Sequence, residues 1–333
     1  EITFSSSKLL NDHFSLYPSE TKSYLEAFKG RYTAKSLLEH LEHLKRLSVL
    51  VIGDTIIDEY HTCKAIGMAS KSATINAQFL KAEQYAGGAL AVANHLSGFC
   101  ENVHLVTCLG EKEPLQEFVE SSLKEGITKK YFSRSDAPTT VKRRFVDPFR
   151  VQKMFEVSYF EDAPLPPDIT GELNACLSGE LSKYDVIVVA DFGHGFIGQE
   201  TVDVLCNTNR FLALNVQTNS ANMGHNPITK YSRGDYVCID EREMRLAFHD
   251  RHGPLEDLIQ ELAVRLSLET LTVTTGQQGS LTYHRGAIHR TPVFVTDVID
   301  TVGAGDAFFS VAAPCVATGV PPEVVGFVGN ASG

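Results

Sequence analysis

The sequence predicts an α/β fold in which a mainly parallel β-sheet is covered by helices on both faces. Short, continuous apolar runs alternate with stretches of helical spacing, which is the order of strand–helix–strand units. Several apolar runs lead directly into glycine or acidic residues, as expected where parallel strands end beside a ligand. The expected strands are residues 48–53, 103–107, 185–190, 211–214, 236–239 and 271–275. The expected helices are residues 88–98, 114–125, 168–183, 199–207, 241–250, 255–268 and 307–317.

The N-terminal part differs from this pattern. Residues 1–35 are polar and mixed, so we expect a linker or an appended helical segment and not a folding unit. Residues 36–47 carry leucines at helical spacing and should pack on the main domain, which we place at residues 36–333. Because the chain starts at Glu1 and stops at Gly333 within the pattern, it is expected to be a piece of a longer protein, truncated at its C-terminus.

Two β-like regions interrupt the alternation, at about residues 59–83 and 138–161. Residues 139–146 and 151–159 could form a hairpin across residues 147–150. We interpret the two regions as one small β-sheet that projects over the site as a lid.

Composition narrows the classes of partner. The chain has 333 residues, of which 43% are hydrophobic, so it can bury a large core. Its net charge of −11 argues against nucleic acid as a partner. No apolar stretch approaches the ~20 residues of a membrane span, and we expect no secretory signal. The seven cysteines form no CxxC pair, which is typical of reduced thiols in a cytoplasmic protein.

Two motifs near the first strand could hold the hydroxyl groups of a sugar. Asp54 and Asp58 follow that strand, where carboxylates are well placed to accept hydrogen bonds, although ordinary loop or cap roles are also open. Gly87 and Gly88 precede a helix of small residues, which permits close approach of a ligand or of another helix. Asn94 on that helix is either a ligand contact or a solvated residue.

The first strand of the expected hairpin carries two cations on one face. In an extended strand Thr140, Lys142 and Arg144 share a face, and Lys142 and Arg144 could point toward a phosphate. Charges that protect an edge strand from aggregation are the alternative.

Two further strand ends could meet a nucleotide and its metal ion. Asp240 and Glu243 follow the strand at residues 236–239, where they could organise Mg²⁺ through water or simply stabilise the first turn of a helix. Thr274, Gly276 and Gly279 belong to a turn that could offer amides and a hydroxyl to a nucleotide phosphate, or could be a plain hairpin turn.

Residues 191–195, Asp-Phe-Gly-His-Gly, also follow a strand and should lie near the site. His194 between two glycines could therefore be exposed and functional.

The most informative stretch is residues 300–306, Asp-Thr-Val-Gly-Ala-Gly-Asp, which precede an apolar helix. Free N–H groups of Gly303, Ala304 and Gly305 at a helix N-terminus would favour an anion. A carboxylate beside such an anion site is electrostatically unfavourable unless it takes a proton from the group that attacks the anion. The combination predicts phosphoryl transfer to a hydroxyl, with Asp306 as the base. A glycine-rich turn with a capping Asp is the simpler alternative.

These motifs, in this order, resemble the ribokinase-like (PfkB) carbohydrate kinases, whereas GxxxxGK[ST], GxGxxG and HExxH are absent from the chain. The resemblance runs from about residue 47 to the end and includes GDxxxD, the glycine pair, TTxKxR, an NxxE-like segment, TxGxxG and DTxGAGD. Within the family the chain is most similar to the heptose-phosphate kinases of lipopolysaccharide precursor synthesis. The resemblance implies a three-layer sandwich with a small projecting β lid.

The resemblance also implies roles for individual residues. Asp58, with Asp54, Gly87 and Gly88, would bind the sugar, and Gly303–Gly305 would form the anion hole beside the base Asp306. Thr274, Gly276, Gly279 and Asn330 would line the ATP site, with Asp240 near the phosphates and Glu243 supporting Mg²⁺. The family's lid often makes a homodimer, and some heptose kinases are fused to a nucleotidyltransferase, which could stand upstream in the parent chain.

Three departures from the family pattern concern binding. Asp240 replaces the Asn of NxxE, Asn215 and Gln217 replace the acid and base of a DPK-like element, and Ala91 replaces an Asn in the glycine-pair helix. We therefore expect an ATP-dependent kinase of a sugar or sugar phosphate. Two alternatives stay open: a catalytically weak or inactive binding module of a larger protein, and a kinase of a non-sugar alcohol such as a nucleoside.

Overall fold

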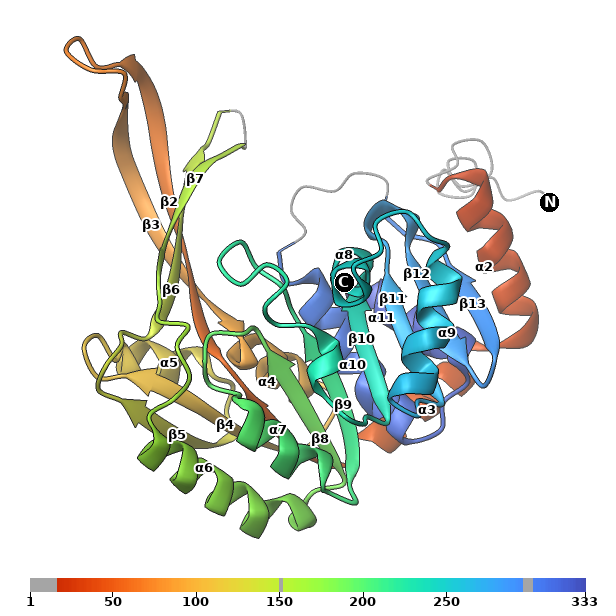
Figure 1. Ribbon diagram of the computed structural model, residues 1–333. Helices are drawn as coiled ribbons and strands as arrows, with labels where there is room; N and C mark the ends of the chain where they lie inside the picture. Colours follow the sequence, from red (N-terminus) through yellow and green to blue (C-terminus); the bar gives the residue numbers. More distant parts are fainter. Residues whose placement is uncertain (1–16, 150–151, 296–301) are drawn as a thin grey trace.

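A nine-stranded sheet and a four-stranded sheet organise the chain (Figure 1). The computed structural model describes residues 17–149, 152–295 and 302–333. The order in the large sheet is β13-β12-β11-β10-β9-β8-β1-β4-β5, and only β12 and β13 run antiparallel to their neighbours. Its strands are β1 Ser48–Gly53, β4 Asn102–Gly110, β5 Thr128–Arg134, β8 Val186–Asp191, β9 Phe211–Val216, β10 Tyr236–Asp240, β11 Thr270–Thr274, β12 Ser280–His284 and β13 Ala287–Thr291. The predicted mainly parallel sheet is confirmed.

Helices cover both faces of this sheet because its central strands are apolar on both sides. In β1, Val49 and Val51 pack on one face, and Leu50 and Ile52 on the other. The first face is covered by α2 Ser19–Arg31, α3 Ala34–Leu44, α4 Ala89–Leu96, α5 Gln116–Ser122, α10 Ala304–Ala317 and α11 Pro322–Ser332. The second face is covered by α6 Pro167–Glu180, α7 Gln199–Cys206, α8 Glu241–Phe248 and α9 Leu255–Arg265. The arrangement is a three-layer sandwich.

The small sheet projects from one end of the sandwich as the predicted lid (Figure 1). Its order is β3-β2-β6-β7, with β2 Thr55–Met68, β3 Ile75–Gly88, β6 Thr140–Asp147 and β7 Gln152–Tyr159. The long β2–β3 hairpin begins directly after β1 and returns directly into α4, so both of its ends are fixed in the core. Residues 150 and 151, within the expected hairpin loop, lie outside the described residues.

Helix α2 gives the N-terminal part its structure. Phe28 is 2% exposed and stacks on Phe327 of α11, with ring centroids 4.3 Å apart. Thr21 donates to the Val293 carbonyl at 3.2 Å, and Arg31 pairs with Glu323 at 2.9 Å. Of the two alternatives expected for residues 1–35, the structure therefore shows a packed helix over Ser19–Arg31, while residues 1–16 are outside its described part.

None of the described helices combines the length and the apolar composition that a membrane span requires. All seven cysteines are free thiols.

Candidate active site

The carboxyl ends of the parallel strands meet at one edge of the large sheet, below the lid. Strands β8, β9, β10 and β11 end there at Asp191, Val216, Asp240 and Thr274. Helix α10 begins near the same edge, and the site is built from its first turn, the strand ends and the root of the lid.

Asp306 lies in the first turn of α10 and is buried, with 8% of its surface exposed. Its Oδ1 accepts a hydrogen bond from Gln217 Nε2 at 2.7 Å. Burial raises the pKa of Asp306 to about 7, against the lowering effect of the Gln217 hydrogen bond. A carboxyl group that titrates near neutral pH is suited to taking a proton from an alcohol.

The start of α10 leaves open space for an anion. Gly303 precedes the helix with φ +83°, a left-handed conformation that favours glycine. A Cβ at Gly303 or Gly305 would meet no atom of the described residues within 4 Å, so packing against those residues does not explain the glycines. The first N–H groups of a helix have no partner within it and are available to a ligand. The predicted motif residues Asp300 and Thr301 are not among the described residues.

A hollow of about 510 Å³ lies between the lid and the start of α10. The residues that line it include Asp58, Gly87, Ala91, Gly303 and Asp306, with Tyr60 and Tyr85 from the lid. Gly87 is required for the position of Asp58, because a Cβ at Gly87 would lie 2.3 Å from Asp58 Oδ2. The structure thus brings Asp58, Gly87, Gly303 and Asp306 to one cavity.

Strand β6 places cations on both faces, as its alternation predicts. Arg144 forms ion pairs with Asp58 and, at 2.9 Å, with Glu156, whereas Arg143 turns to Glu59 on the opposite face at 2.6 Å. Lys142 shares the Arg144 side of the strand, and within the described residues it makes no hydrogen bond or ion pair. Burial lowers the pKa of Lys142, opposed by the negative charge of Asp58.

Asp54 lies outside this hollow and supports a neighbouring turn. It is 4% exposed, and its Oδ2 accepts the Phe192 N–H at 2.8 Å. Burial and the nearby Asp191 raise the pKa of Asp54 to about 6. Gly88, with φ +58°, lets the backbone pass close to Asp54, whose carbonyl oxygen would lie 2.5 Å from a Cβ at this position.

Asn94 and Asn330 connect elements of the fold. Asn94 Nδ2 donates to the Ser122 carbonyl at 2.8 Å, and its Oδ1 accepts the Lys124 N–H at 2.9 Å, which joins α4 to the end of α5. Asn330 donates to Ser280 Oγ at 2.7 Å and so joins α11 to β12. Ala91, and not Asn94, faces the hollow.

Asp240 and Glu243 form a capping box at the start of α8. Asp240 Oδ1 accepts the Glu243 N–H at 2.7 Å, and Glu243 Oε2 accepts the Asp240 N–H at 2.9 Å. Glu243 Oε1 also accepts the Thr218 N–H at 3.0 Å. Burial and the Asp240 charge raise the pKa of Glu243. No group of three or more His, Cys, Asp or Glu suited to a metal ion occurs in the described ranges.

Residues 274–279 form the turn between β11 and β12. Gly276 and Gly279 have φ +57° and +87°, and a Cβ at Gly279 would lie 2.0 Å from the Thr291 carbonyl oxygen. Thr275 closes the turn by donating from its hydroxyl to the Gly279 carbonyl at 3.0 Å. Thr274, Gly276 and Gly279 thus stand at the end of β11, at the same edge as Asp240.

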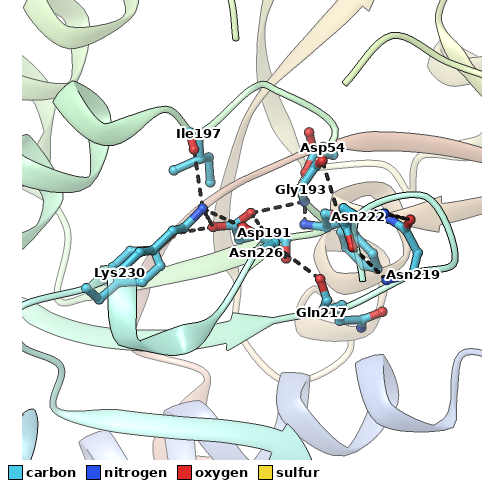
Figure 2. Close-up of polar contacts among 11 residues, drawn as sticks. Asp54, Asp191, Gly193, Ile197, Gln217, Asn219, Asn222, Asn226 and Lys230 are labelled. Carbon is cyan, nitrogen blue, oxygen red and sulfur yellow. Dashed lines mark hydrogen bonds and ion pairs between the residues drawn. The ribbon is translucent and has the colours of Figure 1, made fainter. Parts of the chain in front are cut away.

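A buried polar network below the site, shown in Figure 2, was not found from the sequence. Asp191 pairs with Lys230 at 2.6 Å and accepts from Asn226 Nδ2 at 3.1 Å. Asn219 and Asn222 donate to the Phe192 carbonyl. Three asparagines within eight residues of chain were the only sequence signal for this network.

The prediction that His194 is exposed is wrong. His194 is 5% exposed, packs against Phe160 with ring centroids 5.2 Å apart, and lines a small cavity with Asp54. The network fixes the turn around it, and burial lowers the pKa of His194 to about 4.

Residues 46–333 match the model of the pfkB family carbohydrate kinases. The chain is 25% identical over 281 residues to a D-beta-D-heptose 7-phosphate kinase of Bordetella bronchiseptica, a match covering 84% of this chain and 87% of that protein. It is 25% identical over 265 residues to the bifunctional protein HldE of Helicobacter pylori, a match covering 78% of this chain but only 56% of that relative.

Solved structures show the same fold. A ribokinase of Thermotoga maritima superimposes with a TM-score of 0.62 at 20% identity, over 86% of this chain and 91% of that one. Phosphofructokinase-2 of Escherichia coli gives a TM-score of 0.67 at 12% identity, over 86% and 91% of the two chains.

Replacing the buried Asp306 should stabilise the protein in a pH-dependent way. The raised pKa means that native Asp306 binds its proton more tightly than the unfolded chain does, so this contribution to stability is full below about pH 4 and is lost as pH rises through about 7. In Asp306→Asn the side chain is neutral at every pH. We expect a gain in unfolding free energy on the order of 2 kcal/mol at pH 8, which shrinks toward pH 5.

Urea unfolding at the two pH values measures this, with the exposed Asp162→Asn as the control. A variant no more stable than the unaltered protein at pH 8 would contradict the burial of a charge at Asp306.

Proposed function

Since the chain belongs to the pfkB family of carbohydrate kinases, we propose that it transfers the γ-phosphoryl group of ATP to a hydroxyl of a sugar phosphate. Its place in the family makes it a kinase of a sugar or sugar phosphate, and the specific acceptor is the proposal. The observation that supports the proposal best is the buried Asp306 carboxyl group beside the open N-terminus of α10.

Asp306 acts as the general base in this reaction. Its carboxylate takes the proton of the acceptor hydroxyl as that oxygen attacks the γ-phosphorus, and the bond from phosphorus to the bridging oxygen of ADP breaks. The Gly303, Ala304 and Gly305 amides stabilise the charge on the transferring group.

The acceptor lies in the hollow between Asp58 and Asp306. Asp58 accepts hydrogen bonds from sugar hydroxyls. Its carboxylate is held by Arg144 and fits beside Gly87 because glycine has no side chain. Gly88 and Asp54 stabilise the backbone next to this part of the site. Arg144 is already neutralised by Asp58 and Glu156, so among the described residues of this strand Lys142 is the cation available for a phosphate on the acceptor. The heptose 7-phosphate kinase relative makes a heptose phosphate the first acceptor to test.

ATP lies along the ends of β10 and β11. Thr274, Gly276 and Gly279 line the ATP site. Asn330, held by its hydrogen bond to Ser280, lies near the adenine ring of ATP. Mg²⁺ would enter with the ATP phosphates. Because three carboxylate oxygens of Asp240 and Glu243 already accept backbone N–H groups, both residues would hold the ion through water.

The partners of the chain belong to the same proposal. A cytoplasmic location fits free thiols and the supply of ATP. A nucleotidyltransferase domain elsewhere in the parent chain is consistent with the greater length of the bifunctional relative. Asn94 is not part of the proposed ligand site, because the oxygen and the nitrogen of its side-chain amide both form hydrogen bonds with backbone groups.

A homodimer through the lid is suggested by the face of the small sheet that is turned away from the hollow. Phe79, His61, Phe145 and Phe155 form a continuous aromatic row on that face, and Phe79 and Phe155 are 56% and 51% exposed. Exposed apolar side chains in such a row favour burial against another surface, and a second copy supplies a matching one.

Charged side chains in this row should separate the dimer. Light scattering should give twice the chain mass for the unaltered protein and the monomer mass for Phe79→Asp with Phe155→Asp, while Phe149→Asp beyond the row is the control. A monomeric unaltered protein at micromolar concentration would remove the dimer from the proposal.

Asp306→Asn should reduce turnover by about 10²–10⁴-fold, because an amide cannot accept the proton. The assay is ADP release with ATP and Mg²⁺ across hexoses, heptoses, their phosphates and a nucleoside. Turnover on one acceptor that is lost in the variant supports the mechanism. Binding of a sugar without turnover under any condition would favour the inactive binding module, and turnover on the nucleoside alone would favour the non-sugar alternative.

Lys142→Met should raise KM for a sugar phosphate by roughly 10–100-fold, the range expected for one lost charge-assisted hydrogen bond, and leave KM for the unphosphorylated sugar unchanged. Arg143→Met, one residue away on the opposite face, is the matched control and should change neither value. An equal rise in KM for both acceptors would contradict the role of Lys142 in phosphate binding.

A further inference from the structure

Gln217 contacts the proposed base directly. It is the first residue after β9, and its Nε2 donates both to Asp306 Oδ1 at 2.7 Å and to Asn215 Oδ1 at 3.1 Å. These are two of the positions at which the chain departs from the family pattern. These two departures, Asn215 and Gln217, therefore belong to one series of hydrogen bonds that reaches the proposed base Asp306.

The orientation of the Gln217 amide is fixed by its neighbours. Asn215 Nδ2 donates to the buried Cys238 carbonyl at 2.7 Å, so Asn215 must present its oxygen to Gln217. A reversed Gln217 amide would set its own oxygen against the oxygens of Asn215 and Asp306. Only the donating orientation satisfies all of these groups.

The backbone of Gln217 is held by the buried network of Figure 2. Its N–H donates to the Asp191 carbonyl at 2.8 Å, and its carbonyl accepts from Asn226 Nδ2 at 3.2 Å. Asn226 is fixed in turn by Lys230, whose ammonium group pairs with Asp191. Gln217 is thus attached to a rigid part of the core, and not to a free loop.

We propose that Gln217 is a positioning residue for Asp306. The side-chain N–H of Gln217 holds the Asp306 carboxylate in one orientation and keeps it in the ionised form that accepts a proton. The proposal rests on the assignment of Asp306 as the base. It also explains how the site works without the charged side chain that the family pattern has at this position: a neutral donor replaces a cation.

Among the described residues, charged or titratable groups near Asp306 include Asp58 of β2, Lys142 of β6, Cys238 of β10 and Glu243 of α8. His95 of α4 lines the same hollow as Asp306. Asp58 and Glu243 oppose a second negative charge and Lys142 favours it. Among the described side chains, Gln217 alone forms a hydrogen bond with the Asp306 carboxylate, so the loss of this bond should be measurable against this background.

Two variants at this position should act in opposite directions. Gln217→Met keeps the length of the side chain and loses the donor, so the acidic limb of the pH profile of kcat should move up by about one pH unit. Gln217→Lys adds a positive charge and should move the limb down. Asn219→Ala, which loosens the same loop but leaves the donor in place, is the control and should leave the limb unmoved.

The same shifts should appear in the ¹³C NMR titration of the Asp306 carboxyl group without ligand, which needs no turnover. Shifts of the same sign in Gln217→Met and Gln217→Lys, or none, would overturn the proposal. If Asp306→Asn keeps full activity while the NMR shifts occur as expected, the proposed base fails and the positioning of Asp306 by Gln217 stands.

Discussion

The burial of one carboxyl group, Asp306, at the start of a buried helix is the constraint on which the site depends. Water is largely excluded there, so the charge must be offset by Gln217, by Lys142 and by the first N–H groups of α10, which have no partner within the helix. The same exclusion raises the pKa to about 7, where a carboxylate can exchange a proton at neutral pH. The burial that makes Asp306 suited to proton transfer therefore also lowers the stability of the folded protein when this residue is ionised.

The surrounding structure serves to hold that residue and an acceptor together. Strand β2 carries Asp58 directly from the core into the lid, and the space at Gly87 admits its carboxylate. Strand β6 adds Arg144, which neutralises Asp58, and Lys142, which has no partner among the described residues. Beneath them the ion pair between the buried Asp191 and Lys230 fixes the loop that begins at Gln217. The acceptor cavity is thus formed between a rigid core and the root of the lid.

Much of this fold could be predicted from the sequence, because buried parallel strands are continuous apolar runs such as residues 186–190. The edge strands β5 and β13, and β12 beside β13, mix polar with apolar residues and so lack this signal. Helix α2 is fixed by distant contacts such as that of Phe28 with Phe327. Local motifs predicted Asp58, Gly87 and Asp306 together, since each follows a strand end or starts a helix. Asp54, Asn94 and His194 could not be placed, because their partners lie far along the chain. The role of Gln217 could not be predicted either, because its partner Asp306 lies 89 residues away along the chain.

The most direct test of the account is ³¹P NMR of the protein with ATP, Mg²⁺ and a heptose phosphate. Transfer to a hydroxyl predicts that the γ-phosphate signal of ATP disappears while a second phosphoester signal appears on the sugar, together with ADP and no free phosphate. ADP accompanied only by inorganic phosphate would show that the attacking group is water, and that the Asp306 site does not activate a sugar hydroxyl.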